Sequence, residues 1–329
     1  MAKKSAKTSE VKVLQGGLIL REDDMTIVGV QEDTPEKELE HVVIPEGVKK
    51  IGPEAFLDQK SMVSIKFPES LVRIDEMAFH NCYGLKEIVF PKNVESIGKC
   101  AFLSCEELKK AELNEGLKFI EDGAFFCTKI RELELPKSIR VVGSESLITV
   151  ERLVIKGSLP HNLIRSIVTM SAYSYSLCKD TDMNVVAEIE TDGRKIFIPK
   201  FSIDKDAGAL ECALNAGIRE MEKNFFMYAP KGRASYDTAF AMYSYLVDTG
   251  EEPTDELKEY IKKVSKKMAE MMISSNRIQD VTKIIRLGLL TKSTMKSLYE
   301  MSVRQNRSDI AAYILEEMKK DVKQASLNI

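Results

Sequence analysis

The chain has 329 residues, of which 44% are hydrophobic and 30% are charged, a length and composition that predict two domains with cores of their own. The 48 basic and 51 acidic residues leave a net charge of −3, which excludes a general attraction to nucleic acid or acidic lipid. No apolar run follows the first lysines, and no stretch approaches the roughly 20 apolar residues that span a bilayer. We therefore expect a cytoplasmic protein without a membrane segment.

The N-terminal region is predicted to hold a flexible start at residues 1–15 and a β-hairpin within residues 16–38. Two segments of alternating polarity flank the turn Asp23-Asp24-Met25-Thr26, a pattern typical of two paired strands. We expect this hairpin to cap the region that follows it.

A repeated unit occupies residues 39–157. Its mark is an Ala-Phe pair that recurs every 23 residues, as Ala55-Phe56, Ala78-Phe79, Ala101-Phe102 and Ala124-Phe125. A fifth unit at 130–147 lacks the pair, and a sixth begins at 150–155 and stops. A fixed period of this length predicts stacked coils, and because no single coil can bury its apolar side chains alone, stability must come from its neighbours.

Each unit begins with a short strand. In the third unit, Leu85, Ile88 and Phe90 are predicted to point inward, while Glu87 and Val89 point outward. Pro45, Pro68, Pro91 and Pro136 end the strands of four units. Two apolar residues then turn the chain back, and the Phe of the pair fills the interior.

These units resemble the BspA-like leucine-rich repeats, in which an apolar strand is followed by a proline, an "IG" dipeptide and then "AF". The segments "VVIPEGVKKIGPEAF" and "IVFPKNVESIGKCAF" carry every element of that pattern. The resemblance covers about residues 16–157. It implies a solenoid with a parallel sheet on one side, whose usual role in that family is recognition of another macromolecule.

Cysteines and histidines do not suggest a reactive site. Cys82, Cys105 and Cys127 recur at intervals of 23 and 22 residues, so we expect a structural ladder of buried free thiols. His41, His80 and His161 are predicted to be surface or junction residues. Neither a nucleophile motif, a metal motif nor a phosphate-binding glycine motif occurs. We therefore predict no enzymatic activity, no cofactor and no metal.

The period of 23 ends near Gly157. Residues 158–203 are expected to form a connecting or capping module, with a helix at 159–170, a loop at 171–176 and a hairpin at 185–199 that turns at Asp192-Gly193.

Residues 204–329 are predicted to be helical, and the joints are short enough to make the helices antiparallel neighbours. The predicted helices are 204–216, 219–229, 233–248, 254–274, 277–287, 293–304 and 308–322. Asn276 and Asn306 occupy matching positions 30 residues apart, in an arrangement similar to ankyrin-type helix pairs, although the "TPLH" tetrapeptide of a true ankyrin repeat is absent. The fold class is thus α+β, with a leucine-rich-repeat solenoid followed by an all-α domain that resembles helical repeats.

The best candidates for function are the outward positions of the repeat strands. They form two columns, His41, Ser64, Glu87, Lys110, Glu132 and Arg152, and Val43, Lys66, Val89, Glu112, Glu134 and Val154. Outward valines among mixed charges favour a protein partner, although valine also simply favours strands. We predict a non-enzymatic scaffold that binds a macromolecule through these strands, the helices or both.

Two other functions stay open. A basic run on one predicted helix could serve a nucleic-acid-associated or ribonucleoprotein-inhibiting protein, and consists of Lys258, Lys262, Lys263, Lys266 and Lys267. A bacterial surface adhesin is the other, with an export signal upstream of the given sequence.

Overall fold

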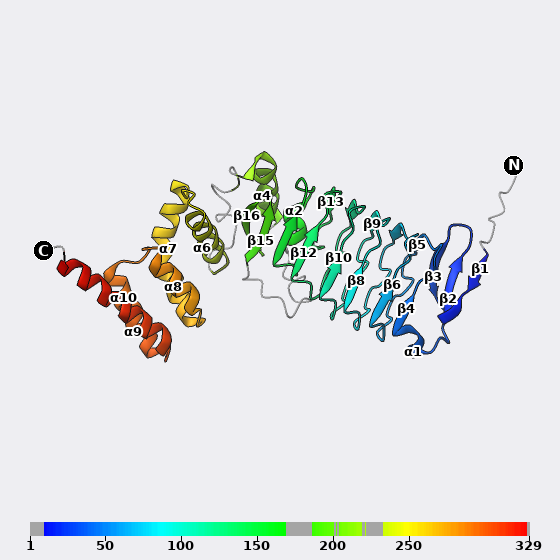
Figure 1. Cartoon of the computed structure of the whole chain (residues 1–329), viewed down its shortest axis with the longest axis horizontal. Coiled ribbons are helices and arrows are strands. Elements are labelled where there is room, and N and C mark those ends of the chain that lie inside the picture. The colour runs from blue at the N-terminus through cyan, green and yellow to red at the C-terminus, as the bar shows by residue number, and fades with distance from the viewer. Residues whose placement is uncertain are drawn as a thin grey trace. The chain divides into compact units, whose positions relative to one another are not determined.

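The computed structural model describes residues 10–168, 186–200, 202, 204–218, 221 and 233–327. The chain divides into two compact units, Met1–Ile218 and Arg219–Ile329, and each is considered by itself. The first is a β-solenoid of about six turns and the second is helical, which confirms the predicted fold class (Figure 1).

The N-terminal cap contains three antiparallel strands. They are β1 (Val11–Val13), β2 (Leu18–Arg21) and β3 (Thr26–Val30), with a 3-10 turn η1 (Gln15–Gly17) between the first two. The predicted hairpin of β2 and β3 is confirmed, and β1 adds a strand ahead of it. A short helix, α1 (Glu36–Leu39), leads into the first coil.

The predicted repeat strands form one side of the solenoid, which we call the front strands. They are β4 (His41–Val43), β6 (Ser64–Lys66), β8 (Glu87–Val89), β10 (Lys110–Glu112), β12 (Glu132–Leu135) and β14 (Arg152–Ile155). Hydrogen-bonded ladders join β4 to β6, β8 to β10, and β12 to β14, all in parallel.

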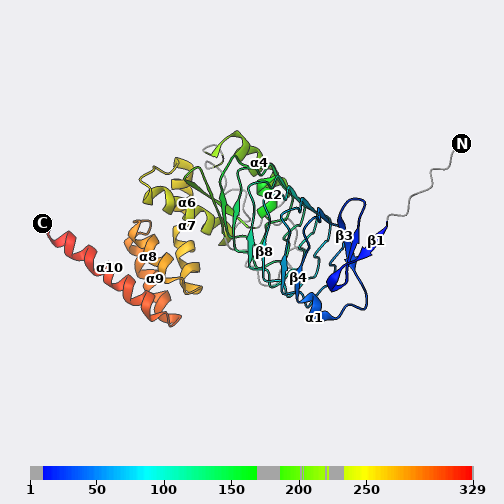
Figure 2. The same ribbon diagram turned by 45° about the vertical axis from the view of Figure 1, so that its right-hand side comes forward.

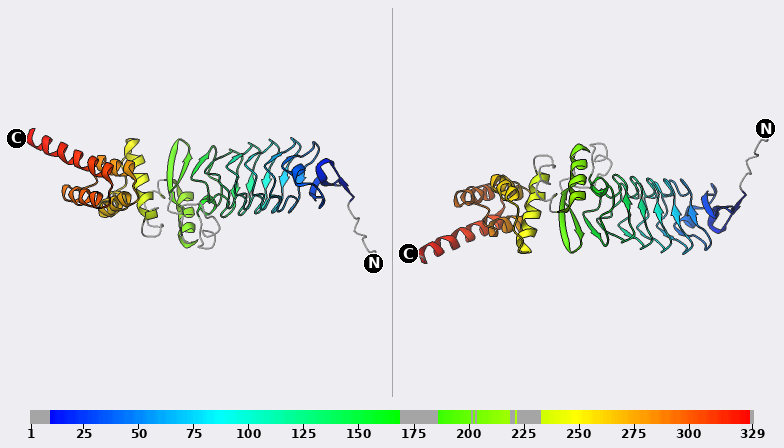
Figure 3. Two further views of the ribbon diagram at one scale, coloured as in Figure 1. Left: turned by 90° about the horizontal axis from the view of Figure 1, so that it is seen from below. Right: turned by 90° about the horizontal axis from the view of Figure 1, so that it is seen from above.

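A second parallel sheet lies on the other side of each coil, where the sequence analysis placed only a turn. Its two-residue strands are β5 (Lys50–Ile51), β7 (Arg73–Ile74), β9 (Ser96–Ile97), β11 (Phe119–Ile120) and β13 (Val141–Val142). We call these the back strands. They continue the cap sheet in the order β1-β2-β3-β5-β7-β9-β11-β13, and Figure 3 shows the coils following one another in register.

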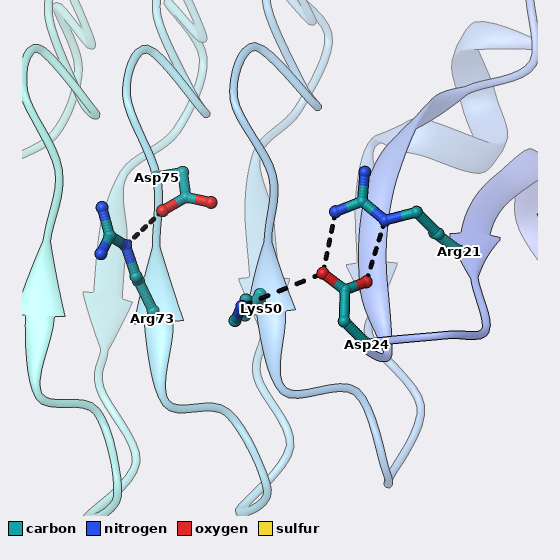
Figure 4. Close-up of polar contacts among 5 residues, drawn as sticks. All are labelled: Arg21, Asp24, Lys50, Arg73 and Asp75. Carbon is teal, nitrogen blue, oxygen red and sulfur yellow. Dashed lines mark hydrogen bonds and ion pairs between the residues drawn. The ribbon is translucent and has the colours of Figure 1, made fainter. Parts of the chain in front are cut away.

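Ion pairs line the cap and the first two coils on this side, and one of them joins the cap to the first coil (Figure 4). Arg21 donates two hydrogen bonds of 2.9 Å to the carboxylate of Asp24, and Lys50 Nζ lies 3.9 Å from the same group. The hydrogen bond from Arg21 lowers the pKa of Asp24 to about 2. Arg73 and Asp75 form a further ion pair on β7 and just beyond it.

The interior contains the column of Phe side chains that the repeat predicts. Phe56, Phe79, Phe102 and Phe125 are fully buried, and the adjacent rings stack almost parallel. The backbone of each pair also links neighbouring coils, since the N–H of Phe79 donates to the carbonyl of Ala101 at 2.8 Å. The Ala-Phe pairs therefore stabilise the stack through both packing and hydrogen bonds.

The predicted ladder of three free thiols is wrong at its third member. Cys82 and Cys105 are buried three residues after Phe79 and Phe102. Each thiol donates a hydrogen bond of 3.2 Å to the carbonyl of the Phe one coil earlier. Burial raises the pKa of Cys82 to about 12. Three residues after Phe125 the chain has the buried Thr128, whose hydroxyl donates to the Phe125 carbonyl. Cys127 falls one position short and is disulfide-bonded.

The C-terminal end of the first unit is closed by a helix and a hairpin. The helix α2 (Leu163–Ile167) is shorter than the predicted 159–170. The predicted hairpin is confirmed as β15 (Val186–Thr191) and β16 (Arg194–Pro199), and β15 pairs in parallel with β14. Both the loop predicted at 171–176 and Cys178 lie outside the described residues.

Two buried or half-buried charged groups hold this end together. Glu211, on α4 (Asp204–Ala216), accepts hydrogen bonds from the N–H groups of Leu163 (3.1 Å) and Ile164 (2.7 Å) at the start of α2. Lys200 is fully buried and donates to the carbonyls of Ile148 (2.9 Å) and Val150. Burial lowers the pKa of Lys200 to about 7.

The second unit contains α6 (Arg233–Asp248), α7 (Asp255–Ser274), α8 (Ile278–Arg286), α9 (Lys292–Arg304) and α10 (Ser308–Leu327). These match the predicted helices to within a few residues, while most of the helix predicted at 219–229 lies outside the described residues. Thr254 and Thr291 cap α7 and α9 with their side-chain oxygens. Figure 2 shows these helices from a second direction.

Candidate binding surface on the front strands

The outward side chains of the front strands form a surface that we call the strand face. The ladder register places His41 beside Ser64 and Val43 beside Lys66. Further along, Glu87 lies beside Lys110, Val89 beside Glu112, Glu132 beside Arg152, and Glu134 beside Val154. The two predicted columns therefore exist as neighbours within each ladder, and whether they bind a partner stays a prediction.

The inward and outward assignments agree with burial. Ile88 and Phe90 are 1% and 4% exposed, while Val89 between them is 55% exposed. Nine of the twelve candidates are exposed, and three are half-buried, namely Ser64, Arg152 and Val154. Alternation along a strand is the cause, because successive side chains point to opposite faces of the sheet.

The N-terminal end of the strand face carries two highly exposed valines among polar side chains. Val43 is 64% exposed and lies next to Lys66, and Val89 follows on the next strand. His41 Nδ1 and Ser64 Oγ are hydrogen-bonded at 2.8 Å. Large apolar side chains this exposed cost free energy in water, so two of them on strands separated only by β6 favour a surface that another molecule covers.

The C-terminal end is an ionic network centred on Arg152. Its guanidinium lies 3.0 Å from Glu190, 3.6 Å from Glu188 and 3.9 Å from Glu132. The hydrogen bond to Glu190 raises the pKa of Arg152. The charges of these side chains are balanced by one another and screened by solvent. They are therefore better suited to setting the specificity of a contact than to supplying its affinity.

Glu188 and Glu190 were missed by the sequence analysis. It treated residues 185–199 as a separate capping hairpin, yet β15 pairs in register with β14 and extends the strand face by one strand. The outward alternation of the two glutamates along "VAEIET" was the available signal. What the sequence lacked was any sign that the hairpin returns to the solenoid sheet.

A hollow of about 820 Å³ lies between β10 and β12, where the front ladders are interrupted. Its floor includes Ala111, the one small residue among the inward positions of the front strands, together with Leu133. Its basic side chains are already used in ion pairs: Lys110 lies 2.5 Å from Glu112 and Lys129 lies 2.6 Å from Glu107.

The basic run lies on the outer side of α7. Lys262, Lys263, Lys266 and Lys267 are exposed, while Lys258 is paired with Glu252 at 2.7 Å and with Asp255 at 3.4 Å. The opposite side of α7 is buried, through Leu257, Ile261, Ser265, Met268, Ala269, Met272 and Ile273. An amphipathic helix of this kind is the ordinary result of packing one face against neighbours.

The described residues contain no group of three or more His, Cys, Asp or Glu side chains placed to hold a metal ion. His80 is half-buried, and His161 is exposed while its backbone continues the back sheet by bridging to Val141. In the same part of the chain, every helix is too short or too polar to cross a bilayer.

Comparison with known proteins identifies the repeat. Residues 35–151 match six copies of the BspA type leucine rich repeat region, which confirms the resemblance for that part of the chain. No curated protein matches the chain. The leucine-rich repeat class, on which the match rests, is generally one of non-enzymatic interaction or surface proteins. The match does not extend to the helical unit.

Solved structures of similar proteins cover about half of this chain. A leucine-rich repeat protein from Bacteroides ovatus is 22% identical, with a TM-score of 0.36, over 52% of this chain and 53% of that one. The leucine rich repeat protein of T. pallidum is 21% identical, with a TM-score of 0.37, over 51% and 80%. A leucine rich cell surface protein from Faecalibacterium prausnitzii is 18% identical, with a TM-score of 0.30, over 46% and 56%. The chain thus spans about half the length of the first and third of these proteins.

Proposed function

We propose that this chain is a non-enzymatic scaffold that binds another protein through the strand face. The observation that carries the proposal is the exposure of Val43 and Val89, at 64% and 55%, on either side of Lys66. A protein interface of standard size buries about 800 Å² on each partner, and several adjacent strands with their loops can supply that area. The surrounding acidic and basic side chains would form the polar rim of such an interface.

Paired substitutions test this proposal. The double variant Lys66→Asp/Val89→Asp places one carboxylate beside Val43 and replaces Val89 with another, where a partner would have to desolvate both. Affinity purification from the native cell should lose the co-purifying partner, with the melting temperature unchanged because neither side chain is buried. The matched control is Val72→Asp, an exposed valine in the turn before back strand β7, which should retain the partner. Retention by the double variant as well would exclude the strand face.

The helical unit is proposed as a second, ankyrin-like scaffold. Asn276 and Asn306 both adopt left-handed φ angles, of 55° and 54°. The residue after each asparagine donates its backbone N–H to a carbonyl in the last turn of the preceding helix. Arg277 donates to the carbonyl of Met272 at 2.8 Å, and Arg307 donates to that of Ser302 at 2.9 Å. This equivalence supports a repeated pair of helices, α7 with α8 and α9 with α10. Partners of the helical unit should still bind the Lys66→Asp/Val89→Asp variant. Deleting the second unit should weaken the binding of those partners and of no others.

A nucleic-acid-associated function is an alternative that the exposed lysines of α7 support. Neutralised phosphates release counterions, so affinity carried by these lysines would fall steeply with salt. Oligonucleotide binding at low salt that is abolished by Lys262→Glu/Lys266→Glu would favour this function. The absence of any oligonucleotide binding at low salt would exclude it.

A surface or adhesin role is the other alternative, and the disulfide at Cys127 is the observation that favours it over the predicted cytoplasmic location. Disulfides persist in oxidising compartments and are rare where thiols are kept reduced. Protease treatment of intact native cells distinguishes the two locations. Loss of the protein from the cells would support exposure at the surface, and full protection would support the cytoplasm.

A further inference from the structure

The two sheets of the solenoid end differently at the cap. On the back side, β3 pairs with β5 and the cap continues the ladder by three strands. On the front side, β6 is the only partner of β4 among the described residues, and the order of that sheet ends at β4. The cap therefore completes the first coil on one side only (Figure 1).

Within the part of the chain that the structure describes, the outer edge of β4 carries backbone groups without a partner strand. The carbonyl of Glu40 accepts from Ser64 at 3.1 Å, and the N–H of Ile44 donates to Lys66 at 3.0 Å. In a parallel ladder alternate residues face the same neighbour, so Val42 also faces β6. The N–H and C=O groups of His41 and Val43 therefore point to the open edge, at the spacing that another strand would need.

A hollow of about 850 Å³ lies along this edge. The cap forms one wall with Leu14, Gln15, Gly16 and Leu18, and the first coil forms the other with His41, Val42, Val43 and Pro45. Leu18 and Val42 are buried beside it, so its floor is apolar. Among the described lining residues, Glu38 is the only acidic one and none is Lys or Arg. The lining therefore fits an occupant that places an apolar side chain inward. Next to that side chain the occupant would carry a lysine rather than a glutamate, because Glu38 is acidic.

We propose that β4 is a strand-addition site, which binds an extended segment of a partner protein as one further front strand. Main-chain hydrogen bonds to His41 and Val43 supply affinity, and the side chain that points inward between Leu14 and Leu18 supplies selectivity. The site uses the backbone edge of β4, whereas the strand face consists of the outward side chains, those of His41 and Val43 included. Its test can therefore fail or succeed independently of the proposed function.

A peptide copy of a front strand is a suitable probe, because the front strands repeat in register. The probe is Lys-Ser-Met-Val-Ser-Ile-Lys-Phe-Pro-Glu, the sequence of residues 60–69, with a fluorescent label and the full chain as receptor. We expect saturable binding by anisotropy and at least about tenfold weaker binding of a scrambled peptide, a difference of about 1.4 kcal/mol. On binding, the His41 and Val43 amides should become protected from hydrogen exchange.

N-methylation of the probe separates strand addition from other modes of binding. By the repeat, the backbone of the probe residue equivalent to Ile65 faces β4, as that of Val42 faces β6, while the residue equivalent to Ser64 faces away. N-methylation at the first position should abolish binding, and N-methylation at the second should change affinity less than about threefold. Equal loss at both positions, or at neither, would overturn the proposal.

A backbone variant provides the matching change on the protein. Val43→Pro removes an N–H that faces the open edge and leaves the bonds between β4 and β6 in place. It should lose the probe while the melting temperature falls by no more than a few degrees, whereas Val43→Ala should keep the probe. Undiminished binding by Val43→Pro would contradict the proposal. Slow exchange of the His41 and Val43 amides in the free chain would also contradict it, because the edge would then already be paired.

Discussion

The rings of Phe79 and Phe102 lie 5.0 Å apart between centroids, with 2° between their planes. Phe56 and Phe125 extend this column at 5.1 Å and 5.4 Å. Each ring belongs to a different coil, and each is fully buried. The column thus ties four coils together, and a change at one level is felt by its neighbours.

Phe102→Ala tests the column directly. Phe102 stacks on rings from both neighbouring coils and meets Phe90 edge-on at 5.9 Å. Its removal leaves a cavity that the flanking coils cannot fill, so we expect the free energy of unfolding to fall by about 3–5 kcal/mol. Urea denaturation followed by circular dichroism measures the change. Phe119→Ala is the control, since Phe119 is 39% exposed and should cost less than about 1 kcal/mol.

The glycine of the repeat is required where two coils approach closely. A Cβ atom at Gly143 would lie 2.2 Å from the backbone nitrogen of Asp122 and 2.3 Å from the carbonyl carbon of Glu121. Gly143→Ala should therefore destabilise the chain by about 1–3 kcal/mol or more, because backbone has to move. Gly29→Ala has open space around its new Cβ, and its thermal midpoint should stay close to that of the wild type. Equal midpoints for the two variants would show that the coils are not packed this closely.

Lys200 makes stability depend on pH in the alkaline range. Its pKa is lowered from 10.5 to about 7 by burial, so between these values the unfolded chain holds a proton that the folded chain has lost. The free energy of unfolding must then rise with pH across this window, by up to about 1.4 kcal/mol per pH unit. Below pH 7 Lys200 is protonated in both states, so the folded chain bears the full cost of burying its charge. Lys200→Met removes the rise. Parallel plots of unfolding free energy against pH for the two proteins would rule this out.

Cys127 should behave differently from the other thiols of the repeats. Cys82, Cys100 and Cys105 are free, while Cys127 is disulfide-bonded. In denaturant without reductant, a maleimide should label these three cysteines, as well as the free Cys212 outside the repeats, and leave Cys127 unmodified, and prior reduction should make Cys127 reactive. Peptide mass spectrometry reads this out by site. Labelling of Cys127 before reduction would contradict the disulfide.

Much of the solenoid could be predicted, because aligning the repeats shows which positions are always apolar and therefore point inward. Ile88 and Val89 are both apolar, yet the spacing alone placed one inside and the other outside. The prediction failed for Cys127, which lies 22 residues after Cys105. The Phe residues are 23 apart at that point, so Thr128 takes the buried position.

Backbone conformation was the less predictable part. Each coil turns through a left-handed residue just before its Ala or Ser, including Met77 at φ 53°, Cys100 at φ 52° and Glu145 at φ 54°. None of these residue types favours positive φ, so neighbouring coils must impose it. The back strands escaped prediction for a related reason, since two residues are too few to show a strand alternation.

The strand face as the site of partner binding is tested most directly by carboxylate footprinting of the complex with the co-purified partner. Glu87, Glu112 and Glu134 project from the front strands, while Glu95 and Glu121 flank the back strands, and all five are exposed. Carbodiimide-driven amidation, measured by mass spectrometry with and without the partner, should fall severalfold at the three front residues and stay unchanged at the two others. Protection at Glu95 and Glu121 with none at Glu87 and Glu112 would contradict the proposal.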